Sequence, residues 1–143
     1  MLKFIRGFFY FFVFLNLVSY SVCASNFYDV NLTKTVTNIT QKSKASMSIE
    51  AKPGDVVEYN IYIVNRTRHA ISNINIVSSV PTFTTLVTTI GCNDGHLPLV
   101  LRCQILTPDG TNRSGYQGDI IWQLLGKLEA GMMAQVSYQV RIK

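Results

Sequence analysis

The sequence has little of the chemistry that enzymes use. Of its 143 residues only two are histidines, His69 and His96, and only eight are acidic. A Ser–His–Asp triad needs a histidine beside a nucleophile on a rigid turn, and no Gly-x-Ser-x-Gly motif occurs. Glycine-rich phosphate-binding motifs are absent as well. We therefore expect a protein that is not an enzyme and that uses no cofactor.

Metal-binding patterns are equally scarce. The paired Cys-x-x-Cys spacing of structural zinc sites is missing. A site built from Cys92, His96 and Cys103 would lack an evident fourth ligand. Asp94 and Asp109 both precede glycines in turn motifs and do not have the alternating acidic spacing of a calcium loop. The sequence thus predicts no metal.

Runs of like charge are also missing. The formal net charge is +5, but the basic residues are scattered singly along the chain. Nucleic acids and anionic membrane surfaces bind clustered positive charge, so neither is an expected partner.

One long apolar run is present, at the amino terminus, and it resembles a secretory leader. Lys3 and Arg6 precede an apolar and aromatic stretch over residues 8–18. Small residues then allow cleavage between Ala24 and Ser25. We predict an exported protein with a signal peptide over residues 1–24 and a mature domain over residues 25–143.

Two other readings of this segment are weaker. A membrane-spanning helix needs about 20 apolar residues, and the run ends at Ser19. A lipoprotein would use Cys23, but Val22 occupies a position where that signal requires a small residue. We therefore expect no membrane span once the leader is removed.

Cleavage would also settle the odd number of cysteines. It removes Cys23 and leaves Cys92 and Cys103. Two cysteines in an oxidising compartment most simply form one disulfide, so we predict a Cys92–Cys103 bridge.

The mature part is dominated by alternating apolar and polar residues, which is typical of half-buried strands. No segment after the leader shows a helical period. The expected strands are Leu32–Val36, Ser46–Ala51, Val56–Asn65, Ile71–Val77, Phe83–Ile90, Leu99–Leu106, one around Trp122 and one ending at Ile142. Such short, regularly spaced strands predict an immunoglobulin-like antiparallel β-sandwich of about seven to eight strands. Trp122, Tyr59 and Tyr138 are expected to face its core.

The order of motifs resembles the conserved-repeat domain of bacterial envelope and surface proteins, a domain of unknown function (number eleven). The segments that carry the resemblance are 32–36, 51–61, 64–67, 74–81 and 122–140, and the Pro-Gly-Asp-x-Val-x-Tyr entry at Pro53 is the most specific of them. The resemblance implies an immunoglobulin-like sandwich with a structural or adhesive role. The chain departs from the family in having a single copy directly after its leader, and in carrying Arg66 and Arg68 in a turn.

Two kinds of modification motif occur. Asn-x-Ser/Thr triplets begin at Asn31, Asn38, Asn65 and Asn112. Because the family resemblance is bacterial, we interpret them as chance products of a chain rich in Asn, Ser and Thr. An internal isopeptide bond at Lys34, helped by Glu58, has no Asn or Asp partner in the last strand.

The leading functional hypothesis is a non-enzymatic structural or protein-interaction domain that binds another envelope or surface protein. Edge-strand pairing or loop contacts would supply the mechanism. The segment Leu32–Ala51, interrupted by Gln41–Lys44, is the expected edge, because lysine often guards against unwanted pairing. The alternative is a periplasmic or secreted small-ligand binding module that uses the Gly91–Gly118 loops and Tyr116.

Overall fold

The computed structural model describes residues 29–143, and within them the chain forms seven strands and no helix. The predicted leader, its cleavage between Ala24 and Ser25, and Cys23 lie outside the described residues. Across residues 29–143, no helix is long and apolar enough to cross a membrane. The strands are β1 (Val30–Asn38), β2 (Val56–Asn65), β3 (Ile71–Ser79), β4 (Thr84–Leu86), β5 (Arg102–Leu106), β6 (Asp119–Leu128) and β7 (Met133–Ile142).

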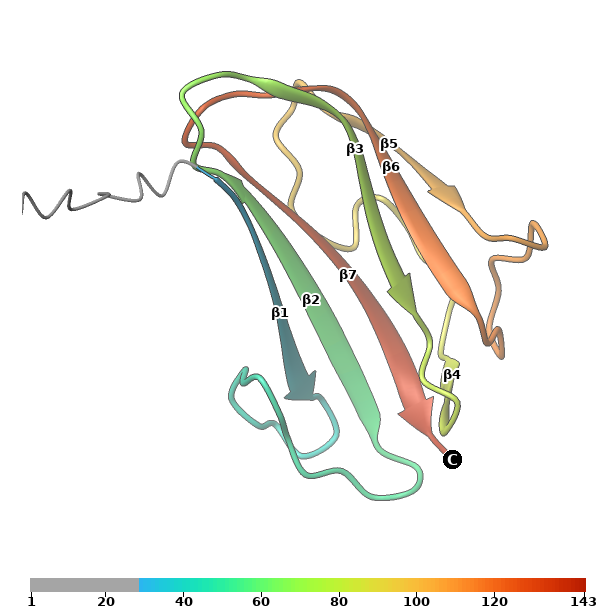
Figure 1. The fold of residues 1–143 in the computed structure, drawn as a ribbon. Helices are drawn as coiled ribbons and strands as arrows, with labels where there is room; N and C mark the ends of the chain where they lie inside the picture. The colour runs from blue at the N-terminus through green and yellow to red at the C-terminus, as the bar shows by residue number, and fades with distance from the viewer. Residues whose placement is uncertain (1–28) are drawn as a thin grey trace, which may run out of the picture.

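The strands form two antiparallel sheets, which confirms the β-sandwich prediction. One sheet has the order β1-β2-β7-β4 and the other has the order β3-β6-β5 (Figure 1). In a constant-type immunoglobulin domain the strands, numbered along the chain, would be ordered 1-2-5-4 and 3-6-7. Here the fifth and seventh strands have exchanged sheets, while the four-plus-three layering is the same.

The aromatic residues expected in the core lie there. Trp122 on β6 is fully buried and its ring centroid is 5.7 Å from that of Tyr138 on β7, so the pair links the two sheets. Tyr59 on β2 stacks on Tyr138 at 5.2 Å and is partly buried at the margin of the core. Alternate residues of β6 and β7 supply six further buried side chains, as the period-two pattern predicts.

The first strand extends beyond the predicted Leu32–Val36, while three other predicted strands are absent or shorter than expected. Ser46–Ala51 is a loop, because after the single bridge between Ser46 and Val36 the segment has no neighbouring strand to pair with. The strand expected over Phe83–Ile90 is only Thr84–Leu86, since the chain leaves the β7 edge soon afterwards. The strand expected from Leu99 starts at Arg102, because the residues before it form a turn.

The Pro-Gly-Asp turn organises the end of the sandwich where β2 begins. Gly54 adopts a positive φ of 91°, which glycine allows without strain. Asp55 Oδ2 then accepts hydrogen bonds from the Lys52 amide (2.9 Å), Asn38 Nδ2 (2.8 Å) and Gln41 Nε2 (2.7 Å). These donors, the Lys52 amide first, lower the pKa of the Asp55 carboxyl and fix the β1–β2 loop.

A buried asparagine performs the same task at the opposite end. Asn65 Nδ2 donates to the carbonyl oxygens of His69 and Leu128, both at 2.8 Å, while its Oδ1 accepts from the Thr67 amide and hydroxyl. Since Asn65 ends β2 and Leu128 ends β6, this side chain connects the two sheets.

Candidate functional site

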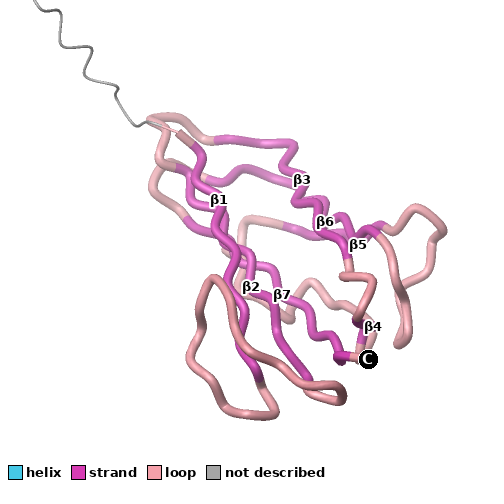
Figure 2. The backbone as a smooth tube through the Cα atoms, turned by 60° about the horizontal axis from the view of Figure 1, so that its bottom comes forward, coloured by secondary structure: helices cyan, strands magenta, loops and turns pink. Residues whose placement is uncertain are grey.

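The outer edge of β1 carries backbone groups that no described residue pairs with. β1 lies at the margin of its sheet, as Figure 2 shows, and runs beside β2 without a bulge. The amide and carbonyl of Val36 point away from β2, because both bond to Ser46 on the other side. Backbone direction alternates along a strand, so the N–H and C=O groups of Leu32 and Lys34 also face outwards. The predicted edge is therefore present over the first half of the segment Leu32–Ala51.

The side chain of Lys34 points inward from this edge. Its Nζ donates to Ser78 Oγ at 3.0 Å and to Tyr138 OH at 3.1 Å, and lies 4.3 Å from the centroid of the Tyr59 ring. Partial burial lowers the pKa of the Lys34 amine. Inward-pointing charges are common on edge strands, and here that position is taken by Lys34 and not by the Gln41–Lys44 segment, which lies in the β1–β2 loop.

The sandwich is open beside the first residues of β1. Leu32 belongs to the same face of β1 as Lys34, yet the residue is 61% exposed. A hollow of about 310 Å³ at the start of β1 is lined by Asp29, Val30, Asn31, Leu32 and Arg66. An extended chain placed along β1 would bring its own side chains against Leu32.

The opposite flank of the sandwich is closed by the loop between β4 and β5. His96 forms an antiparallel bridge with Gln135 of β7, with hydrogen bonds of 2.9 and 2.8 Å. A Cβ on Gly95 would lie only 2.1 Å from the Gln135 carbonyl oxygen, so the loop can approach this closely only because the residue is glycine. Cys92 in the same loop is joined to Cys103 of β5, as predicted, with a Cα–Cα separation of 5.7 Å.

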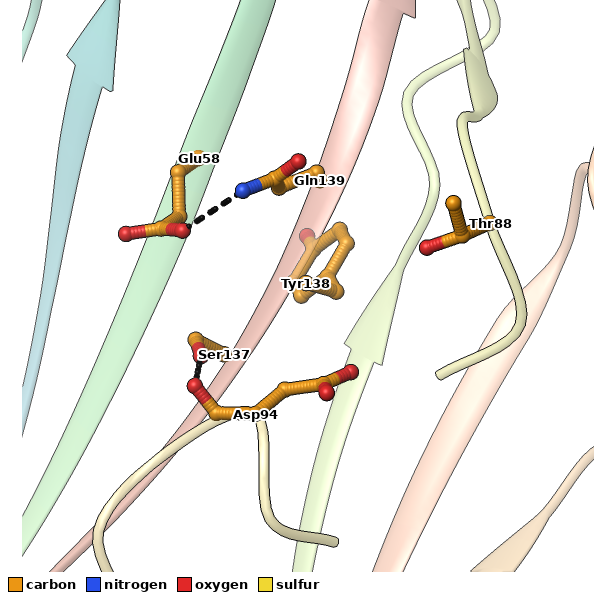
Figure 3. A pocket seen from close by; sticks show the side chains of 6 residues that line it. All are labelled: Glu58, Thr88, Asp94, Ser137, Tyr138 and Gln139. Carbon is orange, nitrogen blue, oxygen red and sulfur yellow. Dashed lines mark hydrogen bonds between the residues drawn. The ribbon is translucent and has the colours of Figure 1, made fainter. Parts of the chain in front are cut away.

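A small polar cavity of about 190 Å³ lies where this loop separates from β7. Figure 3 shows its walls: Glu58 Oε2 accepts from Gln139 Nε2 at 2.9 Å, and the Ser137 hydroxyl donates to the Asp94 carbonyl. Thr88 completes the rim. The cavity is smaller than the 300–1,000 Å³ typical of small-molecule sites and lacks their apolar lining.

An apolar hollow of about 230 Å³ opens at the end of the sandwich between the β1–β2 loop and the start of β4. Met47 and Phe83 stand at its mouth and are largely exposed. Val57, Tyr59 and Ile142 form part of its wall. Its volume suits one large side chain better than a free ligand of ordinary size.

Tyr116, which the sequence suggested as a ligand contact, is a core residue. Only 7% of its surface is exposed, and its hydroxyl donates to the Asp119 carbonyl at 2.9 Å. A Cβ on Gly118 would lie 2.5 Å from this hydroxyl, so the glycine leaves room for the phenol ring. The Gly91–Gly118 loops therefore present no aromatic platform at this position.

The remaining sequence candidates are dispersed. No group of three or more His, Cys, Asp or Glu side chains within residues 29–143 could hold a metal ion. His69 lies in the β2–β3 loop and His96 in the β4–β5 loop. Lys34 and Glu58 sit on opposite faces of their sheet, because Glu58 bonds Gln139 on the outer face while Lys34 reaches inward, so Glu58 cannot assist a reaction at Lys34.

Two of the four glycosylation triplets are inaccessible. Asn38 and Asn65 are fully buried, with their side-chain amides hydrogen-bonded inside the fold. Asn112 is partly buried and bonds both backbone groups of Ile90. Asn31 at the β1 edge has the fewest side-chain hydrogen bonds of the four. Among the described contacts, its amide oxygen accepts only from the Thr33 hydroxyl.

Comparison with known proteins gives no relative: no family model, curated protein or solved structure matches the chain.

Proposed function

We propose that this chain is an exported, non-enzymatic interaction domain that binds an extended segment of another envelope or surface protein along the free edge of β1. We also propose that it is immunoglobulin-like in the broad sense of a shared sandwich architecture, and related to the conserved-repeat domains that its motifs resemble. The partner's strand would pair with β1 through backbone hydrogen bonds, and Leu32 would contact its side chains.

The observation that carries this proposal is that the N–H and C=O groups of Leu32 and Lys34 face outwards and bond to no backbone group within residues 29–143. Main-chain bonds give affinity in strand addition, while side-chain contacts beside the edge give selectivity. The exposed Leu32 offers such a contact. The second half of the β1 edge is already occupied, because Ser46 bridges Val36 there. The docking segment would therefore be short, with about four residues in contact.

Export is supported by the bridge between Cys92 and Cys103, since disulfides persist in oxidising compartments. The leader-like segment over residues 1–24 supports the same location. Both features favour a partner in the periplasm, at the cell surface or in the medium.

A second candidate is the small-ligand binding module, and the apolar hollow beside Met47 and Phe83 is the observation that favours it. A ligand there would have to be small and largely apolar. Strand addition is preferred because its binding groups are already in place and because the hollow, at about 230 Å³, is smaller than typical ligand sites.

Site-specific photocrosslinking tests the proposal. A photoreactive residue at Leu32 should capture a partner protein in the producing cells, whereas the same residue at Glu129, exposed in the β6–β7 turn, should not. The captured protein is then identified by mass spectrometry and its affinity is measured by calorimetry.

The decisive variant is Leu32→Pro, which removes an N–H that faces away from β2 and leaves the β1–β2 hydrogen bonds intact. Proline is tolerated in edge strands at such positions. We expect Leu32→Pro to weaken partner binding by about tenfold or more, and Leu32→Ala, which keeps the N–H, to weaken it less. A folded Leu32→Pro variant that binds like the wild type would refute strand addition. A small molecule that raises the melting temperature without any crosslink at position 32 would favour the second candidate.

A further inference from the structure

The outer face of the β3-β6-β5 sheet exposes apolar side chains on all three strands. Val77 on β3, Leu125 on β6 and Leu106 on β5 point away from the core and are each more than one third exposed. Scattered exposed aliphatic residues are ordinary, but a contiguous group on a sheet face indicates an interaction surface.

The strand register arranges this face in rows. The first row across the sheet is apolar and contains Val77, Ile121 and Leu106. The next row consists of the amides Asn75, Gln123 and Gln104. Beyond it Leu125 lies beside Arg102. Aliphatic side chains thus occur on both sides of an amide row.

The central strand has a symmetric pattern along this face. The outward residues of β6 are, in order, Asp119, Ile121, Gln123, Leu125 and Lys127. Counted from Gln123, the residues two positions away on either side are aliphatic, and those four positions away carry opposite charges. Lys127 stays exposed although the register with β3 shifts between Ser72 and Ile74.

We propose that this face binds a second copy of the same chain, with a two-fold axis that crosses β6 at Gln123. Two copies packed face to face in this way place the two β6 strands antiparallel to each other. Asp119 of each copy then faces Lys127 of the other, Ile121 faces Leu125, and the two Gln123 amides meet at the axis. Isologous interfaces of this kind require a self-complementary surface.

The charge pattern is what selects a second copy over another occupant. Opposite charges lie at equal distances on either side of Gln123. A contact with an unrelated protein does not require this arrangement, whereas a two-fold contact requires it in order to pair unlike charges. The amide at the axis can act as both donor and acceptor, so it can bond to its symmetry mate. Because amides and charges make up much of this face, we expect a weak dimer with a Kd in the range of about 1–100 μM.

This inference goes beyond the proposed function and does not depend on it. The face belongs to the sheet that lacks β1, so both β1 edges of a dimer stay free. A dimer would present two binding edges, and partners with repeated segments would bind it more tightly than they bind a single copy.

Sedimentation equilibrium of the exported chain, with its disulfide intact, tests the proposal at protein concentrations up to about 1 mM. The wild type should dimerise reversibly. Asp119→Lys and Lys127→Asp each place like charges opposite one another, so each should weaken the dimer at least about tenfold. Glu50→Lys and Lys44→Asp make the same charge changes in the β1–β2 loop and should leave the dimer unchanged.

Mixing the two charge variants gives the sharpest result. A heterodimer of Asp119→Lys with Lys127→Asp restores both unlike pairs, so the mixture should associate within about threefold of the wild-type affinity although neither variant does so alone. Such rescue also shows that both variants fold. A monomeric wild type over the whole range would overturn the proposal, as would charge variants that each dimerise like the wild type or a mixture that stays monomeric.

Discussion

The Nζ of Lys34 lies 3.0 Å from the Oγ of Ser78, and this hydrogen bond joins the edge strand of one sheet to the edge strand of the other. The same amine also bonds the Tyr138 hydroxyl and sits over the Tyr59 ring. Lys34 therefore links the two sheets beneath the edge of β1.

Replacement of Lys34 by alanine should lower the free energy of unfolding by about 1–2 kcal/mol, because it removes two hydrogen bonds and a contact with an aromatic face. Chemical denaturation measures the change. Lys44→Ala, at an exposed loop position, should stay within about 0.5 kcal/mol of the wild type. In a double-mutant cycle with Ser78→Ala, a coupling free energy near zero would show that the Lys34–Ser78 bond is not formed in solution.

Asp55 should make the fold sensitive to acid. Its folded-state pKa lies below the ordinary value of 3.8, so the native state favours the carboxylate more than the unfolded chain does. Its stabilising effect is complete above about pH 5 and is lost as the pH falls through 3.8 towards the lowered pKa. Asp55→Asn should melt at a lower temperature at neutral pH and lose less of its stability on acidification than the wild type. If the stability of Asp55→Asn and that of the wild type fall with pH in the same way, Asp55 does not have this role.

Gly95→Ala should detach the loop from β7, since the added methyl group would overlap the Gln135 carbonyl. We expect a loss of about 2–3 kcal/mol in unfolding free energy and faster amide exchange at His96 and Gln135. Gly91→Ala is a matched control, because its Cβ would meet only the movable Asp94 carboxylate. Slow exchange at Gln135 in Gly95→Ala would show that the loop tolerates a side chain there.

The disulfide should withstand thiol titration and contribute to stability. The purified exported chain should contain no free thiol, and its reduction should cost slightly less than about 3 kcal/mol, since the bridged cysteines are 11 residues apart. Denaturation with and without reductant measures this difference. Two titratable thiols in the exported protein would contradict the bridge.

Asn65→Ala should be among the most destabilising single changes, at about 2–4 kcal/mol, because it leaves the buried carbonyl of Leu128 without its donor and frees the Thr67 turn. Asn112→Ala should cost less, since that side chain is only partly buried. Equal thermal stability of the two variants would argue against the connecting role of Asn65.

The sequence was most informative where a strand is paired on both sides. The bounds predicted for β2, Val56 and Asn65, are those observed, because a turn precedes the strand and its alternation is continuous. Ser46–Ala51 alternates as well, yet it has no neighbouring strand, and periodicity alone cannot report whether a partner is present. The short β4 was overestimated for the same reason.

Site residues were harder to predict, because their roles depend on which face of the sheet a side chain occupies and on what covers that face. Tyr116 resembled an exposed loop aromatic, and only the glycine two residues later signalled that its ring is packed against the backbone. The inward direction of Lys34 follows from its register opposite Ile61, which cannot be read from β1 alone. The opposite charges at the two ends of β6, Asp119 and Lys127, are visible in the sequence. Only the structure shows that none of the described strands covers the face on which they lie.

The placement of β2 between β1 and β7 determines how the domain responds to tension. β1 and β7 are both antiparallel to β2, so the start of β1 and the end of β7 lie at opposite ends of the sandwich (Figure 1). A stretching force between these two points acts along the strands and loads both ladders in shear. Many hydrogen bonds must then break together, instead of opening one after another from an end, and the domain resists mechanical extension accordingly.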